Sequence, residues 1–389
     1  MADGRLLLAT LAPARTRENT ERVRTAAADV RNWTELLRLA GRHEVIAPFH
    51  RSLAESAADL LPPGILAVLE DRVRRQSVLG RTAWDELREL LEPFRGAGLS
   101  VMPFKGPVLA HRLYGDWGAR VSHDLDFLVR SEDVPRILSV LDAAGYHEPE
   151  HARLSPAQAA AMRSLYGELA YTRAGRLTVE PHWALAQSTQ AIDLDYDAMW
   201  RRASRVEIEG VELIAPDPRD LFIMLVVHGS KEVWRSAKWL ADFVAFVHAE
   251  PSLDWSGILD HAREAGILRM VHVGFLLAER ATGTSIPEPF RRSIERDPEA
   301  ERLAASIEAR LLDGAAEALR TDRLSSLRWR LRERRRDRLR YAWRTVTTPR
   351  PRHYGIVRLP DSLIAGYVPV KLVHDYVFAP AVKLVRGRT

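Results

Sequence analysis

The sequence predicts an α+β protein in which a small mixed sheet with its helices lies between N- and C-terminal helical domains. Apolar residues recur at helical spacing through about 17–97, and the same spacing resumes after Pro216. Between these regions, 98–215 carries short alternating apolar runs that are separated by glycine-containing turns. We therefore expect four parts: an N-terminal helical domain (1–97), a mixed core (98–215), a C-terminal helical domain (216–318), and an Arg-rich helix with an apolar tail (319–389).

The composition is that of a globular protein with room for two or three domains. The 389 residues are 46% hydrophobic and 28% charged, and none is cysteine. The absence of cysteine excludes disulfides, zinc–thiolate sites and a thiol nucleophile. The first residues lack a signal-peptide cleavage pattern, and no apolar run approaches the ~20 residues of a membrane-spanning helix. We expect a cytoplasmic protein.

The first 97 residues are expected to be helical. One helix begins near Thr20 and another near Asn32, and a turn follows at Pro62–Gly64. A long helix is predicted over Ile65–Phe94, because its apolar residues keep a helical period and glycine follows at Gly96.

The mixed core is expected to alternate strands and helices. Val101–Phe104 is a short apolar strand, and Gly106-Pro107 opens a helix because proline suits the first helical turn. A second strand covers His123–Val129, and a helix runs from Ser131 to Gly145. Two hairpins are then predicted, one pairing Leu165–Thr172 with Leu177–Trp183 and one pairing Val206–Ile208 with Val211–Ile214.

Beyond the core, helices are predicted over Asp217–His228, Ser236–Phe246, about 256–282 and about 287–318. The next segment, 320–344, holds eleven arginines and three acids, so it carries the chain's basic charge. The structural interpretation is a helix that packs on the rest of the protein, with its arginines solvated or paired with acidic residues. The functional interpretation is that this segment contacts a polyanion such as RNA, an acidic leader peptide, or a membrane surface. The last of these would add peripheral membrane association.

The chemistry is expected at the second predicted strand. Side chains alternate across a strand, so Asp124 and Asp126 project from the same face. Two carboxylates placed in this way are costly unless a positive charge lies between them. Mg²⁺ is the usual partner, because it is bound by one or two carboxylates together with substrate phosphates.

Other residues strengthen this interpretation. Lys105 and Gly106 end the first strand and open a helix, where glycine lets phosphate approach the backbone and the helix N-terminus favours anions. Arg120 and Ser122 precede the aspartates on a loop that would rim the site. A third carboxylate, Glu180, lies on a later predicted strand.

These residues together resemble a known family. In order, the pattern is Lys105-Gly106, a helix ending in Leu113-Tyr114, Arg120-x-Ser122-x-Asp124-x-Asp126, a helix ending in Ala144-Gly145-Tyr146, and Glu180-x-His182-Trp183. Over roughly 30–250 it resembles the polymerase-β-type nucleotidyltransferases, and most closely the bacterial uncharacterised nucleotidyltransferase family proteins.

The resemblance implies a polymerase-β-type core and a Mg²⁺-dependent nucleotidyltransferase. It implies that Asp124 and Asp126 hold two Mg²⁺ ions and that Glu180 supplies the third carboxylate and acts as the general base. The substrate would be a nucleoside triphosphate, and we expect ATP. Relatives outside this group usually have Gly-Ser or Gly-Gly on the phosphate turn, whereas here Pro107 follows Gly106 and offers no N–H.

Three further residues are candidates for nucleotide binding. His182 either lines the active site or hydrogen-bonds a neighbour on its strand. Lys231 and Lys238 either reach the triphosphate or are solvated lysines on a helix surface.

The sequence leaves the identity of the acceptor open. The candidates are a hydroxyl or phosphate of a small molecule, a peptide side chain, and an RNA end. The resemblance makes a role of the enzyme in natural-product or peptide tailoring plausible. One alternative is an inactive nucleotidyltransferase fold that serves as a binding or scaffold protein. A second is a toxin-like enzyme that modifies tRNA, and a third is a metal-dependent hydrolase.

Overall fold

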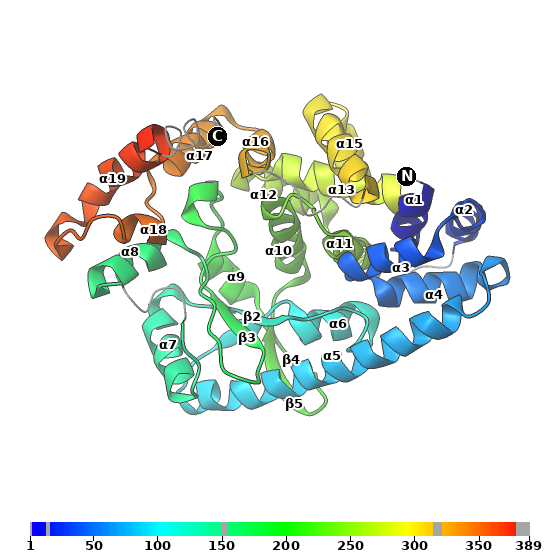
Figure 1. Ribbon diagram of the computed structural model, residues 1–389, viewed down its shortest axis with the longest axis horizontal. Coiled ribbons are helices and arrows are strands. Elements are labelled where there is room, and N and C mark those ends of the chain that lie inside the picture. Colours follow the sequence, from blue (N-terminus) through cyan, green and yellow to red (C-terminus); the bar gives the residue numbers. More distant parts are fainter. Residues whose placement is uncertain (1, 13–15, 149–153, 314–320, 379–389) are drawn as a thin grey trace, which may run out of the picture.

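A computed structural model describes residues 2–12, 16–148, 154–313 and 321–378. It confirms a mixed α+β protein in which helices surround two small sheets (Figure 1). The N-terminal helices lie beside the helices that follow the sheets, while the segment beyond residue 320 extends along the opposite end of the molecule (Figure 1). The division of the chain at residues 97, 215 and 318 stays a prediction.

The main sheet has three strands in the order β1 (Val101–Pro103), β2 (Asp124–Val129) and β3 (Thr178–His182). β1 and β2 are antiparallel, whereas β2 and β3 are parallel. The strands β4 (Ser204–Ile208) and β5 (Val211–Ala215) form a separate antiparallel hairpin, as predicted. β5 packs beside β1, so the hairpin extends the apolar face of the main sheet.

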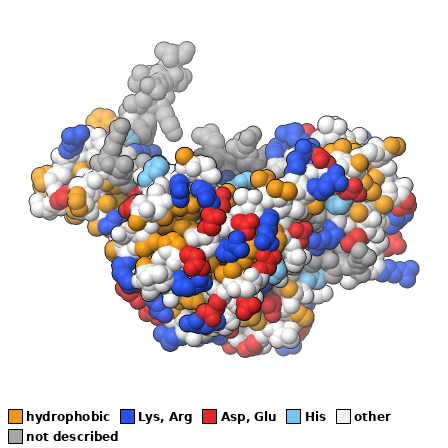
Figure 2. Space-filling model, turned by 90° about the horizontal axis from the view of Figure 1, so that it is seen from below, with side chains coloured by type: hydrophobic (Ala, Val, Ile, Leu, Met, Phe, Trp, Pro, Cys, Tyr) orange, Lys and Arg blue, Asp and Glu red, His pale blue; other side chains and the backbone are white. Residues whose placement is uncertain are grey.

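Three helices cover this sheet: α5 (Ile65–Gly96), α6 (Gly106–Tyr114) and α7 (Val134–Ala143). α5 runs along the lower edge of the molecule (Figure 1). Its C-terminal half contributes buried Trp84 and Phe94 to a core that also holds Phe127 of β2. Seen from below, basic and acidic side chains are interspersed on the face that carries α5 (Figure 2).

The expected strand Leu165–Thr172 is wrong. Leu165 is the last residue of α8 (Pro156–Leu165), which begins with a capping box between Ser155 and Gln158. The rest of this segment makes only isolated bridges, and two of them join Glu168 to His182 and Tyr171 to Val179. The helix cap outweighed the β-propensity of the residues that follow it.

The remaining helices form one large hydrophobic cluster, in which residues from both ends of the sequence meet. Phe49 from the N-terminal part packs in the same core as Phe222, Phe243 and Phe275. The expected helices at 256–282 and 287–318 are each divided in two, the first because Gly266 ends α12 with φ +71°. This cluster includes the helices α1 (Ala2–Ala9), α2 (Arg17–Ala28), α3 (Trp33–Arg42), α4 (Ile46–Ser56), α10 (Pro218–Lys231), α11 (Ala237–Ala249), α12 (Trp255–Ala265), α13 (Leu268–Thr282), α14 (Glu288–Ile294) and α15 (Pro298–Asp313). The short helix α9 (Tyr196–Arg202) precedes the β4–β5 hairpin.

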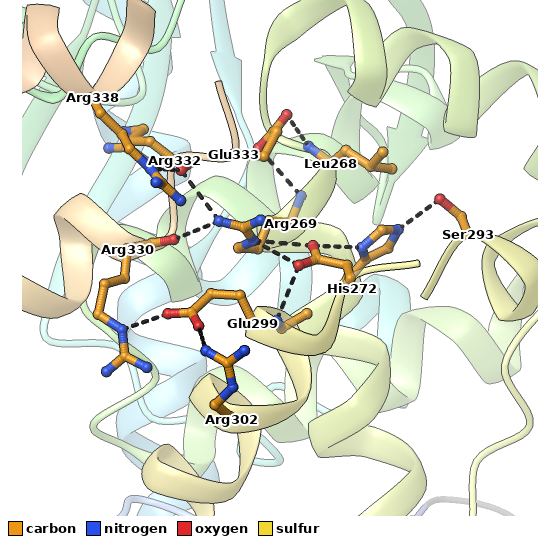
Figure 3. Close-up of polar contacts among 12 residues, drawn as sticks. Leu268, Arg269, His272, Ser293, Glu299, Arg302, Arg330, Arg332, Glu333 and Arg338 are labelled. Atoms are coloured by element: carbon orange, nitrogen blue, oxygen red, sulfur yellow. Dashed lines mark hydrogen bonds and ion pairs between the residues drawn. The ribbon is translucent and has the colours of Figure 1, made fainter. Parts of the chain in front are cut away.

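The Arg-rich segment is two helices rather than the one expected: α16 (Thr321–Arg330) and α17 (Arg335–Thr347). Between them, the Glu333 carboxylate accepts hydrogen bonds from the backbone N–H groups of Leu268 and Arg269 at the start of α13. Arg269 Nη1 donates to the carbonyls of Arg330 and Arg332, at 3.1 and 3.3 Å (Figure 3). These contacts with α13 satisfy the polar groups that a break in a helix exposes.

Many arginines of this segment make internal contacts. Arg330 pairs with Glu299, Arg340 pairs with Asp193, and Arg344 donates to the carbonyl of Ser188. Contact with a polyanion or a membrane surface stays a prediction. The chain continues beyond this segment through α18 (Pro351–Tyr354) and α19 (Tyr367–Val373). Among the described residues, the helices are too short or too polar to cross a membrane.

Candidate active site

The sheet register brings three carboxylates to one face. Asp124 and Asp126 are two residues apart on β2, so they project from the same side. Glu180 on the parallel strand β3 is the register partner of Asp126. Because paired residues of neighbouring strands project from the same side of a sheet, Glu180 lies on the same face as the two aspartates.

Asp126 is the most strongly bound of the three. Its Oδ1 accepts hydrogen bonds from Lys105 Nζ at 2.9 Å and from His182 Nε2 at 2.8 Å. All three side chains are buried. Burial alone would raise the pKa of the Asp126 carboxyl, but the Lys105 ammonium and the His182 ring outweigh it and hold that pKa well below its usual range.

The His182 ring continues into a chain of alternating charges. Its Nδ1 lies 2.9 Å from Glu168 Oε2, and the same oxygen accepts a hydrogen bond from Lys231 Nζ at 2.9 Å. Burial would lower the pKa of the imidazolium, but Asp126 and Glu168 together raise it. Lys231 is accordingly not a solvated lysine, because its side chain is buried against Glu168.

Asp124 and Glu180 lack such partners. No hydrogen bond or ion pair with a described residue reaches the half-buried Asp124 carboxylate, and burial and Asp126 raise its pKa. Glu180 Oε2 lies 3.9 Å from His182 Nε2, and burial together with the two aspartates raises the pKa of Glu180 to about 7. This face of the sheet therefore carries more negative charge than its lysine and histidine neutralise.

The donor set suits a hard divalent cation. Asp126, Glu180 and His182 offer ligand atoms that all lie within 4.8 Å of one another. His182 Nε2 is engaged with Asp126, which leaves the carboxylate oxygens of Asp126 and Glu180 as donors, and Asp124 adds a third on the same face. Oxygen donors in this number are those that Mg²⁺ accepts in proteins, so the residues fit the ion.

The predicted phosphate turn begins α6. Gly106 adopts φ +59°, and a Cβ there would lie 3.4 Å from the carbonyl oxygen of Asp124 and 3.8 Å from Ser122 Oγ. The Ser122 hydroxyl is buried and has no hydrogen-bond partner among the described residues. An unpartnered hydroxyl next to a helix N-terminus supplies a donor where Pro107 lacks an N–H.

Arg120 and Lys238 are engaged elsewhere. Arg120 Nε donates to Asp242 Oδ2 at 2.9 Å, and both side chains are buried. Lys238, at the start of α11, forms an ion pair with Glu44 through its Nζ. The structure therefore places both residues near the aspartates but bonded to other acids, and their roles in nucleotide binding stay predictions.

Glu168 and His228 belong to this site, although the sequence did not predict either as a site residue. Glu168 faces His182 across the loose hairpin before β3, a position that the predicted pairing of 165–172 with 177–183 contained. His228 lies one helical turn before Lys231 on α10, and no residue in the described part of the chain hydrogen-bonds its Nδ1. Burial, Lys105 and Lys231 hold the pKa of the His228 ring well below its usual range.

Comparison with known proteins gives one match. A family model described as "Uncharacterised nucleotidyltransferase" matches residues 29–283, about two thirds of the chain, and this range includes every site residue named above. No curated protein and no solved structure matches the chain.

Proposed function

We propose that this chain, which belongs to the uncharacterised nucleotidyltransferase family, transfers a nucleoside monophosphate from a nucleoside triphosphate to an acceptor. An acceptor oxygen attacks the α-phosphorus, the bond from that phosphorus to the bridging β-phosphate oxygen breaks, and pyrophosphate leaves. One observation carries the proposal: the carboxylates of Asp124, Asp126 and Glu180 share a sheet face that adjoins the α6 N-terminus. A polymerase-β-type description of the core is part of this proposal.

Asp124, Asp126 and Glu180 would hold Mg²⁺, which neutralises phosphate charge and lowers the pKa of the attacking group when it is bound. Two ions are expected, as in the resemblance. Glu180 is the general base of this proposal. Its pKa of about 7 suits proton transfer near neutral pH, because it is then ionised in part of the molecules and still basic enough to accept a proton.

The turn at Gly106 and the free Ser122 hydroxyl would bind the triphosphate, with ATP as the expected nucleotide. Lys105 is within reach of both the carboxylate face and the start of α6, so it supplies positive charge to either. The chain of Lys231, Glu168 and His182 would hold Asp126 in place through ion pairs and hydrogen bonds to fixed partners, which positions the carboxylate rather than performs the chemistry.

The test is a transfer assay with each α-³²P-labelled nucleoside triphosphate, Mg²⁺ and a lysate of the source cell. The Asp124→Asn/Asp126→Asn variant is the control. Label that moves to an acceptor with the wild type alone supports transfer, and the acceptor's size class separates small molecules, peptides and tRNA. Labelled monophosphate without a labelled acceptor indicates a hydrolase. Absence of labelling, together with no calorimetric binding of Mg²⁺–nucleotide, indicates an inactive scaffold.

A further inference from the structure

A cavity of about 110 Å³ lies between the core and the Arg-rich segment. One wall comes from residues that flank β3 in the chain, including Tyr166 and Gln190. The other wall comes from α16, α17, the residues that directly follow α17, and α19, and it includes Arg328, Arg350 and Lys371. The volume exceeds what several water molecules need, so it has room for a tetrahedral oxyanion with the group that carries it.

The cavity is positively charged. Arg328, Arg350 and Lys371 line it, and no Asp or Glu is among the described residues of its lining. Lys371 is 2% exposed, and its ammonium donates to the carbonyl of Thr345 at 2.6 Å. The nearest carboxylate, Asp375, lies 4.0 Å from Lys371 Nζ and also contacts Arg352 at 2.8 Å. The lysine charge is therefore only partly compensated.

The two arginines keep donors available. Arg328 Nε donates to the carbonyl of Lys231 at 2.7 Å, and no hydrogen bond joins its Nη groups to a described residue. The exposed Arg350 guanidinium likewise makes no hydrogen bond with a described side chain. Burial first, and then the neighbouring Arg350, lower the pKa of the Lys371 ammonium. A bound anion would relieve both the repulsion and the unsatisfied donors.

A chain of contacts connects the cavity with the carboxylate site. Arg328 contacts Lys231, whose ammonium bonds Glu168, and Glu168 contacts His182 on β3. Tyr166 in the wall is two residues before Glu168 in the chain. A ligand group held here would be connected to the carboxylate site through this chain of contacts.

We propose that this cavity binds a phosphate group of the acceptor, so that the acceptor is a phosphate-bearing molecule. The inference rests on the proposed nucleotidyl transfer for the word acceptor, while the anion site itself does not. Three cations match a dianionic phosphate better than a singly charged carboxylate, and arginine binds phosphate oxygens through paired N–H donors. The same inference gives the Arg-rich segment, together with the residues that follow it up to Lys371, a role as the second wall of a substrate site.

The test is calorimetric titration of inorganic phosphate into the full-length chain. The Arg350→Met and Lys371→Met variants remove lining cations, and Arg350→Met alters an exposed side chain, which keeps the test open if Lys371→Met misfolds. Arg335→Met, an exposed arginine of α17 outside the cavity, is the matched control. We expect about a tenfold or larger loss of phosphate affinity in each cavity variant and wild-type affinity in the control.

Three results would overturn the proposal. One is phosphate affinity in Arg350→Met equal to that of the wild type, and another is loss of phosphate binding in Lys105→Ala alone, which would assign the anion to the α6 turn. The third is displacement of phosphate by acetate at equal concentration, which would assign the cavity to a carboxylate. A parallel titration with Mg²⁺–ATP separates the two proposals. If the wild type binds phosphate, Arg350→Met weakens this binding and no nucleotide binds, the result supports the anion site and counts only against nucleotidyl transfer.

Discussion

Asp126 and Glu180 are register partners on the parallel strands β2 and β3, yet their carboxyl groups are held in opposite ways. Lys105 and His182 hold the pKa of Asp126 well below its usual range despite its burial, whereas burial and the two aspartates raise the pKa of Glu180 to about 7. The pair therefore combines one permanently charged carboxylate with one that changes charge near neutral pH.

Asp126→Asn is expected to destabilise the chain, whereas Asp124→Asn is not. Asp126→Asn leaves Lys105 without its charge partner in a buried place, which costs about 3–5 kcal/mol. Asp124→Asn removes a charge that has no partner and is repelled by Asp126, so the free energy of unfolding stays the same or rises. Urea denaturation of the metal-free chain measures both values. Equal destabilisation by the two substitutions would contradict the assignment of the lysine to Asp126.

Mg²⁺–ATP is expected to stabilise the wild type against heat. A ligand at one hundred times its Kd adds about 2.7 kcal/mol to the free energy of unfolding. Glu180→Gln removes one of the proposed metal donors, so its melting temperature should no longer respond to Mg²⁺–ATP. The control is Glu308→Gln, which alters a carboxylate that pairs with Arg280 and is not a proposed ligand. A response retained by Glu180→Gln would exclude this residue from the metal site.

Gly106→Ala is expected to weaken nucleotide binding, whereas Gly115→Ala is not. Both glycines have φ near +60°, at +59° and +66°, so alanine costs about 1–2 kcal/mol at either position. Only at Gly106 does the added Cβ approach the site, at 3.4 Å from the Asp124 carbonyl oxygen, since nothing lies within 4 Å at Gly115. Calorimetry with Mg²⁺–ATP compares the two variants, and an equal affinity for nucleotide would argue against the phosphate turn.

Asp242→Asn is expected to destabilise the chain by about 3–5 kcal/mol, because it leaves the buried Arg120 guanidinium without a counter-charge. The double variant Arg120→Met/Asp242→Leu removes both charges and should recover a large part of this loss. Tyr114 also donates to Asp242, at 3.2 Å, and therefore loses a partner in either case. Urea denaturation of the three chains tests the coupling; a double variant no more stable than Asp242→Asn would contradict it.

His43 is expected to make the chain less stable below pH 6.5. The ring is 1% exposed, its Nδ1 accepts a hydrogen bond from the N–H of Ala237, and burial lowers its pKa from 6.5 to about 4. Between pH 6.5 and 4 the unfolded chain therefore binds a proton that the folded chain does not. The free energy of unfolding consequently falls as the pH is lowered through this window. The slope is about 1.4 kcal/mol per pH unit, or roughly 2 kcal/mol between pH 6.5 and 5.

His43→Gln removes this titration and keeps an acceptor for the Ala237 N–H. Urea denaturation at several pH values should therefore give a flatter profile for the variant than for the wild type between pH 6.5 and 5. Parallel profiles would show that the histidine does not titrate in this way.

The sequence was informative where a feature depends on neighbouring residues. The alternation of β2 placed Asp124 and Asp126 on one face, and the residues that open α6 identified Lys105 and Gly106. Glu180 was found on its strand, and the helical period of α5 gave that helix nearly to its ends. These patterns are local, because they reflect the two- and 3.6-residue periods of the backbone.

The tertiary structure alone decided which of these residues meet. The register of β2 with β3 pairs Asp126 with Glu180, and packing joins His182 to Asp126 across 56 residues and Arg120 to Asp242 across 122. The break in the Arg-rich segment likewise depends on α13. Glu333 of the break accepts a hydrogen bond from the backbone of α13, and Arg269 of α13 donates to the carbonyl of Arg330. Such contacts are chosen by burial and charge pairing between distant segments, and no periodicity within one segment records the identity of its partner.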